Sequence, residues 1–277
     1  MGKGKLQKFA EMATNPLVVS CPYDHALQPG MFPLYGHWGE AFFHNDHPII
    51  LELGCGRGEY TIGLARRFPQ TNFIGVDIKG ARMWHGATEA LHEGLNNAGF
   101  LRTRVELLDR LFAPGEVSEL WLTFSDPQVK KPRKRLTHPL FLERYRRFLL
   151  DGGRIHLKTD SQFLFTYTRL VCERNHLPVE ASEEDLYAAT GAEAWLTEIQ
   201  TYYERMWREQ GLPIRYLRFR LPSSGTLRAS ERNQTRLDCR AGAVSPKATL
   251  EEPDEEIPVD GYRSYGHEVR STKLTRK

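Results

Sequence analysis

One short stretch constrains the fold of this 277-residue chain more than any other, because it joins an apolar run to a glycine-rich turn. Residues 49–53 (IILEL) form an apolar run typical of a buried strand, and the glycine-rich turn GCGRG follows at 54–58. Glycines at such a turn let the backbone bend sharply and come close to a ligand. Asp77 ends the next apolar run, 19 residues after Gly58, where a carboxylate can bind both hydroxyls of a ribose. The pattern predicts a ribose-containing ligand at the end of a parallel sheet.

Strands and helices alternate along the central part of the chain. Apolar runs predict further strands over 73–77, 100–108, 118–124, 154–158 and 215–221, and the intervening stretches predict helices over 59–68, 80–95, 138–149 and 161–174. This alternation favours an α/β fold with a Rossmann-like, doubly wound, mostly parallel sheet covered on both faces. We expect one domain over 49–221, preceded by a basic, irregular segment over 1–48. A polar tail over 222–277 is expected to be mobile or loosely docked.

The glycine spacing narrows the class of ligand. The turn has the pattern GxGxG, whereas a dinucleotide pyrophosphate is usually bound by GxGxxG. Glu52, just before the turn, would repel a diphosphate but suits a ligand that carries cationic groups. S-adenosylmethionine has an ammonium group, a sulfonium group and a ribose but no phosphate. The sequence therefore predicts S-adenosylmethionine as the cofactor, with Glu52, Gly54, Gly56 and Asp77 around it.

The net charge of +3 conceals a local basic segment. Residues 126–147 hold eight Lys or Arg side chains and two acidic ones, a local charge of +6, whereas 251–256 is acidic. Asp126 directly follows the strand predicted at 118–124, at the sheet edge where open α/β folds bind ligands. Basic side chains beside that edge suit a polyanionic substrate held through its phosphates.

Several classes of protein are excluded by the remaining features. No apolar run is long enough to span a membrane, and the basic start MGKGKLQKFA lacks the apolar core of a secretory signal. The four cysteines are far apart, which predicts neither a zinc site nor a disulfide framework. We therefore expect a cytoplasmic protein without a metal. The sequence leaves monomer and homodimer open.

Five motifs in order make the central region recognisable: LELGCGRGEY, NFIGVDIKGARM, FSDPQVKKPRKRL, HLKTD and TYYERMWREQGLPI. Over roughly 49–221 the chain closely resembles the bacterial tRNA (guanine-N7)-methyltransferases, which are class I methyltransferases. The resemblance implies methyl transfer from S-adenosylmethionine to N7 of a variable-loop guanosine in tRNA, giving 7-methylguanosine.

The resemblance also implies residue roles. Glu52 and Asp77 match acidic residues around the cofactor, and Asp126 matches an aspartate that is regarded as catalytic and also lies near the cofactor. Four positions match substrate contacts, namely Lys130, Asp160, Thr201 and Glu204, and the last two match the Thr and Glu that hold the target base. Arg104 stands where the family often has Asp or Asn as a cofactor contact. Gln128 replaces the tryptophan of the family's DPW motif.

The chemistry of guanine refines these roles. N7 carries a lone pair and no proton, so alignment of donor and acceptor can supply most of the catalysis. Methylation leaves a positive charge on the base, which a nearby carboxylate can stabilise. A second carboxylate can accept hydrogen bonds from guanine N1–H and N2–H₂, which adenine does not offer. We hypothesise that Glu204 binds this edge and that Asp126 positions the base and the cofactor.

Two alternatives remain at this stage. A methyltransferase acting on an exocyclic amine typically carries [DNS]-P-P-[YFW] after the fourth strand, and Ser125-Asp126-Pro127-Gln128 matches it poorly. The other alternative is a non-catalytic protein that binds tRNA or activates a partner and has a vestigial cofactor pocket, and only Gln128 supports it.

Overall fold

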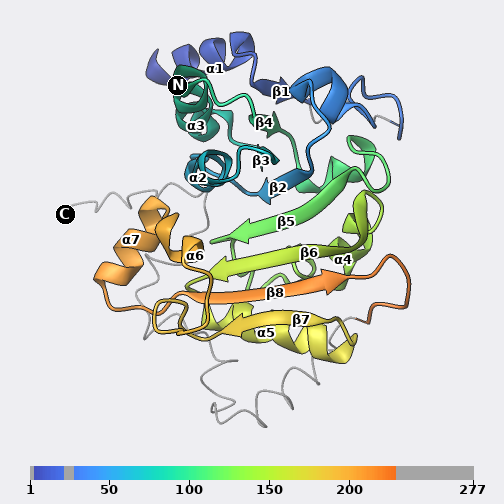
Figure 1. The fold of residues 1–277 in the computed structure, drawn as a ribbon, viewed down its shortest axis with the longest axis vertical. Helices are drawn as coiled ribbons and strands as arrows, with labels where there is room; N and C mark the ends of the chain where they lie inside the picture. The colour runs from blue at the N-terminus through green and yellow to red at the C-terminus, as the bar shows by residue number, and fades with distance from the viewer. Residues whose placement is uncertain (1–2, 22–27, 229–277) are drawn as a thin grey trace, which may run out of the picture.

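The computed structural model describes residues 3–21 and 28–228 (Figure 1). Cys239, the acidic stretch at 251–256 and the predicted polar tail from residue 229 onward therefore lie outside the described residues.

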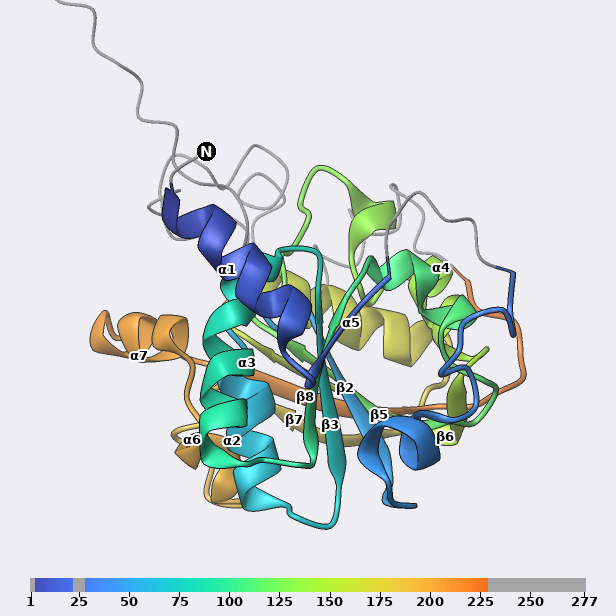
Figure 2. The same ribbon diagram turned by 90° about the horizontal axis from the view of Figure 1, so that it is seen from above.

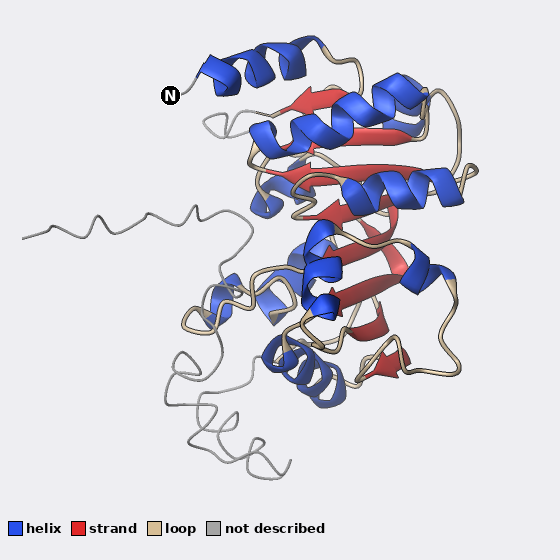
Figure 3. Ribbon diagram, turned by 90° about the vertical axis from the view of Figure 1, so that its left-hand side faces the viewer, coloured by secondary structure: helices blue, strands red, loops and turns tan. Residues whose placement is uncertain are grey.

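A single eight-stranded sheet forms the centre of the fold. In spatial order its strands are β1 (Val18–Ser20), β4 (Ala98–Arg102), β3 (Asn72–Asp77), β2 (Ile49–Leu53), β5 (Val117–Thr123), β6 (Leu149–Thr159), β8 (Arg215–Leu221) and β7 (Val179–Glu183). Neighbours from β1 to β6 are parallel, and β8 is antiparallel to both β6 and β7. Figure 3 shows the strands stacked one above another. The predicted doubly wound, mostly parallel sheet is confirmed.

Helices cover both faces of this sheet. The helices are α1 (Lys3–Thr14), α2 (Glu59–Arg67), α3 (Gly80–Glu93), α4 (Pro139–Tyr145), α5 (Gln162–Arg174), α6 (Trp195–Glu198) and α7 (Tyr202–Glu209), with short helical turns η1 (Trp38–Phe43), η2 (Val105–Arg110) and η3 (Pro132–Lys134). Figure 2 shows α1, α2 and α3 on one side of the sheet and α4 and α5 on the other. A separate apolar core fills the space on each side.

The strand order reverses between β2 and β5, and we call the region outside the carboxyl ends of these two strands the crevice. From β2 the chain adds β3 and then β4 in one direction, and afterwards adds β5 and β6 in the other. Glu52 of β2 and Trp121 of β5 are partners in register across this reversal. In open α/β sheets, ligands bind outside the carboxyl ends of the strands at such a reversal. The glycine-rich turn follows β2 and Asp126 follows β5, so the predicted site residues flank the crevice.

Two predicted elements extend well beyond the observed ones, whereas the strand predicted over 154–158 is shorter than the observed β6. The strand predicted over 100–108 ends at Arg102, the register partner of Asp77, where its neighbour β3 also ends. A strand cannot continue its ladder beyond its partner, so residues 105–110 form the 3₁₀ helix η2 and bury Leu108. The helix predicted over 138–149 ends at Tyr145, because the carbonyl of Phe148 already accepts a hydrogen bond from Val117 N at 3.1 Å.

The segment before residue 49 is more regular than its sequence predicts. Residues 3–14 form α1, and β1 extends the sheet by pairing Val18 with Phe100. Trp38 is 1% exposed, stacks on Phe112 with 4.9 Å between ring centroids, and donates its Nε1–H to Leu111 O at 2.9 Å. The expectation of an irregular leader over 1–48 was thus wrong for these parts, which belong to the same sheet and core as the rest.

Candidate active site

The glycine-rich turn holds the carboxylate of Asp77 in place. Gly54 and Cys55 donate their backbone N–H groups to Val76 O at 2.8 and 3.1 Å. Gly56 N donates to Asp77 Oδ2 at 3.0 Å, and Lys79 N donates to Oδ1 at 2.9 Å. These contacts fix Asp77 at the carboxyl end of β3, directly beside the turn, as the sequence pattern predicts.

The glycines of the turn serve two different needs. Gly54 and Gly58 have φ values of 82° and 77°, which side chains rarely adopt. A Cβ placed on Gly58 would lie 2.6 Å from the ring of Phe100, so this glycine allows α2 to pack against the sheet. A Cβ placed on Gly54 would meet nothing within 4 Å, so the backbone there faces open space and can approach a ligand.

Glu52 lies beneath the turn, where its carboxyl joins three elements. It is 4% exposed and accepts hydrogen bonds from Thr61 N at 2.8 Å, from Thr61 Oγ1 at 2.5 Å and from the hydroxyl of Thr123. Burial raises the pKa of Glu52 to about 7, although these hydrogen bonds oppose the shift. The side chain therefore ties β2 to the start of α2 and to β5, and the structure gives it the role of an anchor.

Replacement of Glu52 by glutamine should change how stability depends on pH. The pKa of about 7 exceeds the ordinary value of 4.5, so the folded chain binds more protons than the unfolded chain between these two pH values. This contribution to the free energy of unfolding is full below pH 4.5 and is lost, by about 3 kcal/mol, as pH rises to about 7. Urea denaturation across pH 4.5–8 should show that decline in the wild type relative to Glu52→Gln. If the free energies of unfolding of the wild type and of Glu52→Gln changed in parallel with pH, the raised pKa of Glu52 would be contradicted.

Asp126 lies just beyond β5 and is held by Gln128. The backbone N–H of Gln128 donates to Asp126 Oδ1 at 2.9 Å, and its side-chain Nε2–H donates to Oδ2 at 2.7 Å. Gln128 has a φ of 47° and Phe124 a φ of 49°, so the loop turns sharply on both sides of the aspartate. The glutamine that replaces the family's tryptophan thus contacts the aspartate directly and orients its carboxylate.

Arg135 stabilises the loop that carries Asp126. Its guanidinium donates to Pro127 O at 3.1 Å and to Val129 O at 3.0 Å, and it lies over the rings of Tyr167 and Phe163 at 4.4 and 4.6 Å. The residue is 4% exposed, so it cannot serve as a surface contact for a polyanion.

Other arginines of the predicted basic segment are also engaged within the protein. Arg144 donates to Glu106 O, Arg146 donates to Glu143 and to the carbonyls of residues 222, 224 and 225, and Arg147 donates to Asp109. The exposed cations around η3 are Lys130, Lys131, Arg133 and Lys134, which we call the basic loop. The positive surface beside Asp126 is therefore narrower than the eight cations of the sequence indicate.

The two residues matched to base recognition stand at the start of α7. Thr201 caps the helix by accepting from Glu204 N at 3.2 Å, and both side chains are buried. Glu204 forms an ion pair of 2.7 Å with Lys158 of β6, and both side chains are 0% exposed. Burial lowers the pKa of Lys158, and the adjacent Glu204 opposes that shift.

Asp160 and Arg104 complete the set of predicted site residues. Asp160 follows β6, where burial raises the pKa of its carboxyl to about 6, and its backbone carbonyl accepts from Arg215 at 2.9 Å. Arg104 is exposed and follows Thr103, whose N–H donates to Asp77 O at 3.1 Å. Five adjacent parallel strands thus share one carboxyl edge. It carries the turn after β2, Asp77 at the end of β3, Arg104 after β4, Asp126 after β5 and Asp160 after β6.

Helix α7 closes one side of that edge. In Figure 1 the arrows of β5 and β6 point toward α6 and α7. Phe124, two residues before Asp126, belongs to a small apolar cluster with Trp207 of α7 and Ile214. This cluster brings the helix that carries Thr201 and Glu204 next to the loop that carries Asp126.

Lys158 and Arg135 are functional candidates that the sequence pattern did not predict. Lys158 lies in HLKTD on a strand whose neighbours are buried, and a cation at such a position requires a partner. The sequence could therefore have indicated Lys158 as a candidate. It could not have indicated Arg135, because this residue lies within a run of exposed basic residues.

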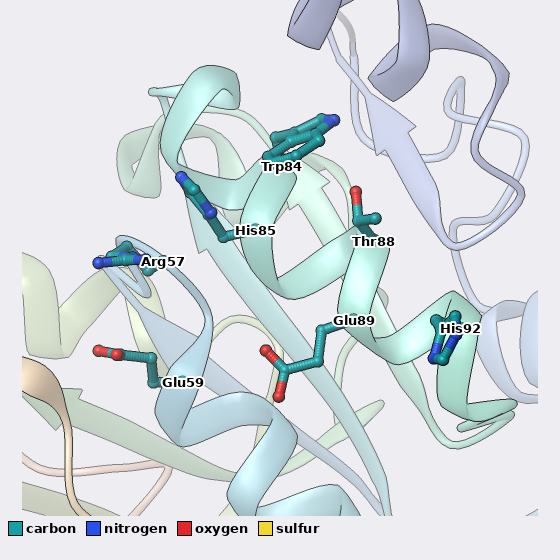
Figure 4. Close-up of a pocket in the computed structure, with 7 residues that line it drawn as sticks. All are labelled: Arg57, Glu59, Trp84, His85, Thr88, Glu89 and His92. Carbon is teal, nitrogen blue, oxygen red and sulfur yellow. The ribbon is translucent and has the colours of Figure 1, made fainter.

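A surface cleft of about 320 Å³ begins at Arg57 of the glycine-rich turn and extends along α3. It is lined by Arg57, Glu59, Trp84, His85, Thr88, Glu89 and His92. Figure 4 shows these side chains between the start of α2 and the outer side of α3. None of the residues predicted as ligand contacts lines it, and its mixed charge indicates no ligand class, so the crevice at the strand ends is the better candidate site.

Membrane spans and metal clusters are both absent from the described part of the chain. Within residues 3–21 and 28–228, no helix has the length and apolar character needed to cross a membrane. Over the same ranges, no three His, Cys, Asp or Glu side chains gather in a way that could hold a metal ion.

Comparison with known proteins agrees with the geometry. Residues 46–217 match the family described as "Putative methyltransferase". The chain is 53% identical over 277 residues to the tRNA (guanine-N(7)-)-methyltransferase of Bacteroides thetaiotaomicron, and the match covers 100% of both chains. It is 52% identical over 261 residues to that of Porphyromonas gingivalis, covering 94% of this chain and 98% of the relative. Among solved structures, the 16S rRNA methyltransferase KamB covers 63% of this chain and 88% of its own, with 13% identity and a TM-score of 0.48.

The full-length match and the family match both identify a methyltransferase. The region matched by the family contains every site residue predicted from the sequence. The chain belongs to the tRNA (guanine-N(7)-)-methyltransferase family.

Proposed function

We propose that this chain transfers the methyl group of S-adenosylmethionine to N7 of a variable-loop guanosine in tRNA. The observation that carries the proposal is the placement of two groups across one crevice. The glycine-rich turn and Asp77 lie on the β2 and β3 side, and Asp126 lies on the β5 side with the basic loop next to it. A methyl donor and a polyanionic acceptor can therefore meet at the point where the strand order reverses.

The residues at the turn fit S-adenosylmethionine. The open face of Gly54 accepts a ligand against the backbone, and Asp77 presents a fixed carboxylate suited to ribose hydroxyls. We propose Gly54, Gly56 and Asp77 as direct contacts, with Arg104 beside them, and Glu52 as the group that anchors the turn from below. When bound, the cofactor supplies a methyl group made electrophilic by its sulfonium.

The proposed roles of the other residues follow from the acceptor chemistry. Guanine N7 needs no base to remove a proton, so the protein contributes alignment and a stabilising charge. We assign the negative charge that stabilises the methylated base to Asp126, whose carboxylate lies at the crevice and is oriented by Gln128. Asp160, Thr201 and Glu204 are proposed to hold the target nucleoside, and Lys130 with the rest of the basic loop is proposed to hold tRNA phosphates. Such an enzyme acts in the cytoplasm, where tRNA is found.

Methyl-labelled S-adenosylmethionine and bulk tRNA test this function. We expect label in tRNA, and digestion should yield it as 7-methylguanosine. Label recovered in an N²-methylated or other nucleoside would show a different target atom. Tight binding of tRNA without any transfer would show that the chain is a binding protein.

Removal of the Gln128 side-chain contact should lower turnover. Gln128→Leu eliminates the Nε2–H bond to Asp126 at 2.7 Å while keeping the size of the side chain. Hydrogen bonds to charged groups contribute on the order of 1.5–3 kcal/mol, so we expect kcat to fall at least about tenfold, with the affinity for S-adenosylmethionine unchanged. Gln162→Leu, at an exposed position of α5, is the matched control. A wild-type kcat in Gln128→Leu would mean that Asp126 needs no side-chain support.

A further inference from the structure

The carboxylate of Glu204 is satisfied on one oxygen and unsatisfied on the other. Oε1 receives the Lys158 ammonium at 2.7 Å and the Tyr187 hydroxyl at 2.9 Å. Oε2 is buried and has no hydrogen-bond partner within the described residues. The whole side chain has no exposed surface. A buried carboxylate oxygen without a donor is costly, so the position of this side chain is set by the contacts on Oε1.

The partner of Oε1 is itself held in one orientation. Lys158 Nζ donates to Leu196 O at 2.6 Å and to Ile199 O at 3.1 Å, besides its contact with Glu204. An ammonium has three N–H groups, and these three contacts use all of them. The cation also lies 5.0 Å from the centre of the Tyr60 ring. Lys158 therefore joins β6 both to α7 and to the segment around α6.

Tyr187 is fixed in a similar way. The guanidinium of Arg208 lies 3.5 Å from the centre of its ring, and its ring packs with the apolar clusters beside α6 and α7. The hydroxyl lies 2.9 Å from Glu204 Oε1 and 3.4 Å from Thr197 O, and the shorter contact, to Glu204, is the stronger one. The two donors on Oε1 thus come from separate parts of the chain, β6 and the segment before α6.

The unsatisfied oxygen belongs to the helix that packs beside the loop of Asp126. Glu204 belongs to the same short helix as Trp207, which packs on Phe124 close to Asp126. Oε2 is an acceptor, so the ligand group that it can take is an N–H or O–H donor. Guanine offers two adjacent donors on one edge, N1–H and N2–H₂, whereas the edge of adenine has no such pair.

We propose that Lys158 and Tyr187 are positioning residues that hold Glu204 so that Oε2 accepts hydrogen bonds from the edge of the target guanine. The proposal rests on the proposed methyl transfer to guanosine and adds the two residues through which the base is selected. Because Glu204 has no exposed surface, the proposal requires α7 or the segment around α6 to shift when the base binds. Lys158 contacts both of these parts of the chain.

Inosine provides the probe, because it retains N1–H and N7 but lacks the N2 amine. Two tRNA transcripts that differ only in guanosine or inosine at the target position are compared by kcat/KM. We expect the wild type to prefer guanosine by at least about tenfold. Tyr187→Phe should reduce this preference at least about threefold, with the affinity for S-adenosylmethionine unchanged and the melting temperature lowered no more than in the control below. Tyr216→Phe is the matched control, since it removes a buried hydroxyl contact of 2.8 Å to His156 and none to Glu204.

A double-mutant cycle tests whether Lys158 acts through Glu204. Lys158→Met should lower kcat/KM at least about thirtyfold in the wild-type background and less than about threefold in a Glu204→Gln background, because residues that act as one unit are not additive. An equal decrease in both backgrounds would overturn the proposal, as would an unchanged guanosine preference in Tyr187→Phe. If Lys158→Met does not fold, the comparison of Tyr187→Phe with Tyr216→Phe still tests the proposal. Absence of transfer by the wild type to either transcript would instead contradict the proposed function.

Discussion

Replacement of Asp126 by asparagine is expected to lower kcat by about two to three orders of magnitude. Transfer of a methyl cation equivalent to N7 places positive charge on the purine, and a preorganised charge of opposite sign at such a point contributes on the order of 3–4 kcal/mol. Asparagine keeps the size and the acceptor oxygen that receives Gln128 N, but it removes the negative charge and the acceptor of the Gln128 Nε2–H. The affinity for S-adenosylmethionine should change less than about threefold, and single-turnover methyl transfer to tRNA measures the effect on chemistry.

Asp151→Asn provides a matched control for that variant. Asp151 lies on β6, is exposed and accepts from Ser223 N, so the same chemical change occurs there far from the crevice. The control should keep the wild-type kcat. If Asp126→Asn also kept kcat within about threefold, the charge of Asp126 would be unnecessary and alignment alone would account for the rate.

The second large effect is expected in tRNA binding. The triple variant Lys131→Gln, Arg133→Gln and Lys134→Gln removes three exposed cations of the basic loop. Hydrogen bonds to charged groups contribute on the order of 1.5–3 kcal/mol each, so the affinity for tRNA should fall by about a hundredfold or more. The dependence of log K on log salt should become shallower by about one for each phosphate that is no longer neutralised. Filter binding across a range of salt concentrations measures both quantities.

A second triple variant controls for the change of net charge. Arg67, Arg169 and Arg220 lie on α2, α5 and β8, away from the basic loop. Their replacement by glutamine changes the total charge equally, and the affinity for tRNA should change less than about threefold. Equal decreases in the two triple variants would show that the overall charge, and no local surface, attracts the RNA.

The sequence predicts the fold best where the local pattern and the sheet agree. The strands at 49–53 and 72–77 are almost wholly buried, so their apolar runs are continuous and their ends are marked by Gly54 and Asp77. The strand at 18–20 has only three residues, which is too short for a periodic signal. Apolar residues at 105–108 resemble the continuation of a strand, but the end of β3 at Asp77 stops the ladder.

In the candidate site, too, the sequence predicts positions that depend on local patterns and does not predict contacts between residues far apart in the chain. Strand alternation alone places Asp77, Asp126 and Asp160 at one edge, because Asp77 ends a parallel strand and the other two follow one. The contact between Lys158 and Glu204 joins residues 46 positions apart and depends on how α7 packs, which no local pattern records. The hydrogen bonds from Thr61 and Thr123 to Glu52 likewise depend on tertiary packing. The role of Glu52 as an anchor therefore could not be predicted from its place before the glycine-rich turn.

Methyl transfer to a tRNA transcript with 7-deazaguanosine at the variable-loop target tests the central claim most directly. The analogue keeps N1–H and N2–H₂, so the proposed contact with Glu204 is retained, but a carbon replaces the N7 acceptor. We predict that the chain transfers labelled methyl to the guanosine transcript and none to the 7-deazaguanosine transcript, while binding both with similar affinity. Equal transfer to the two transcripts would contradict the claim that N7 of this guanosine is the methyl acceptor.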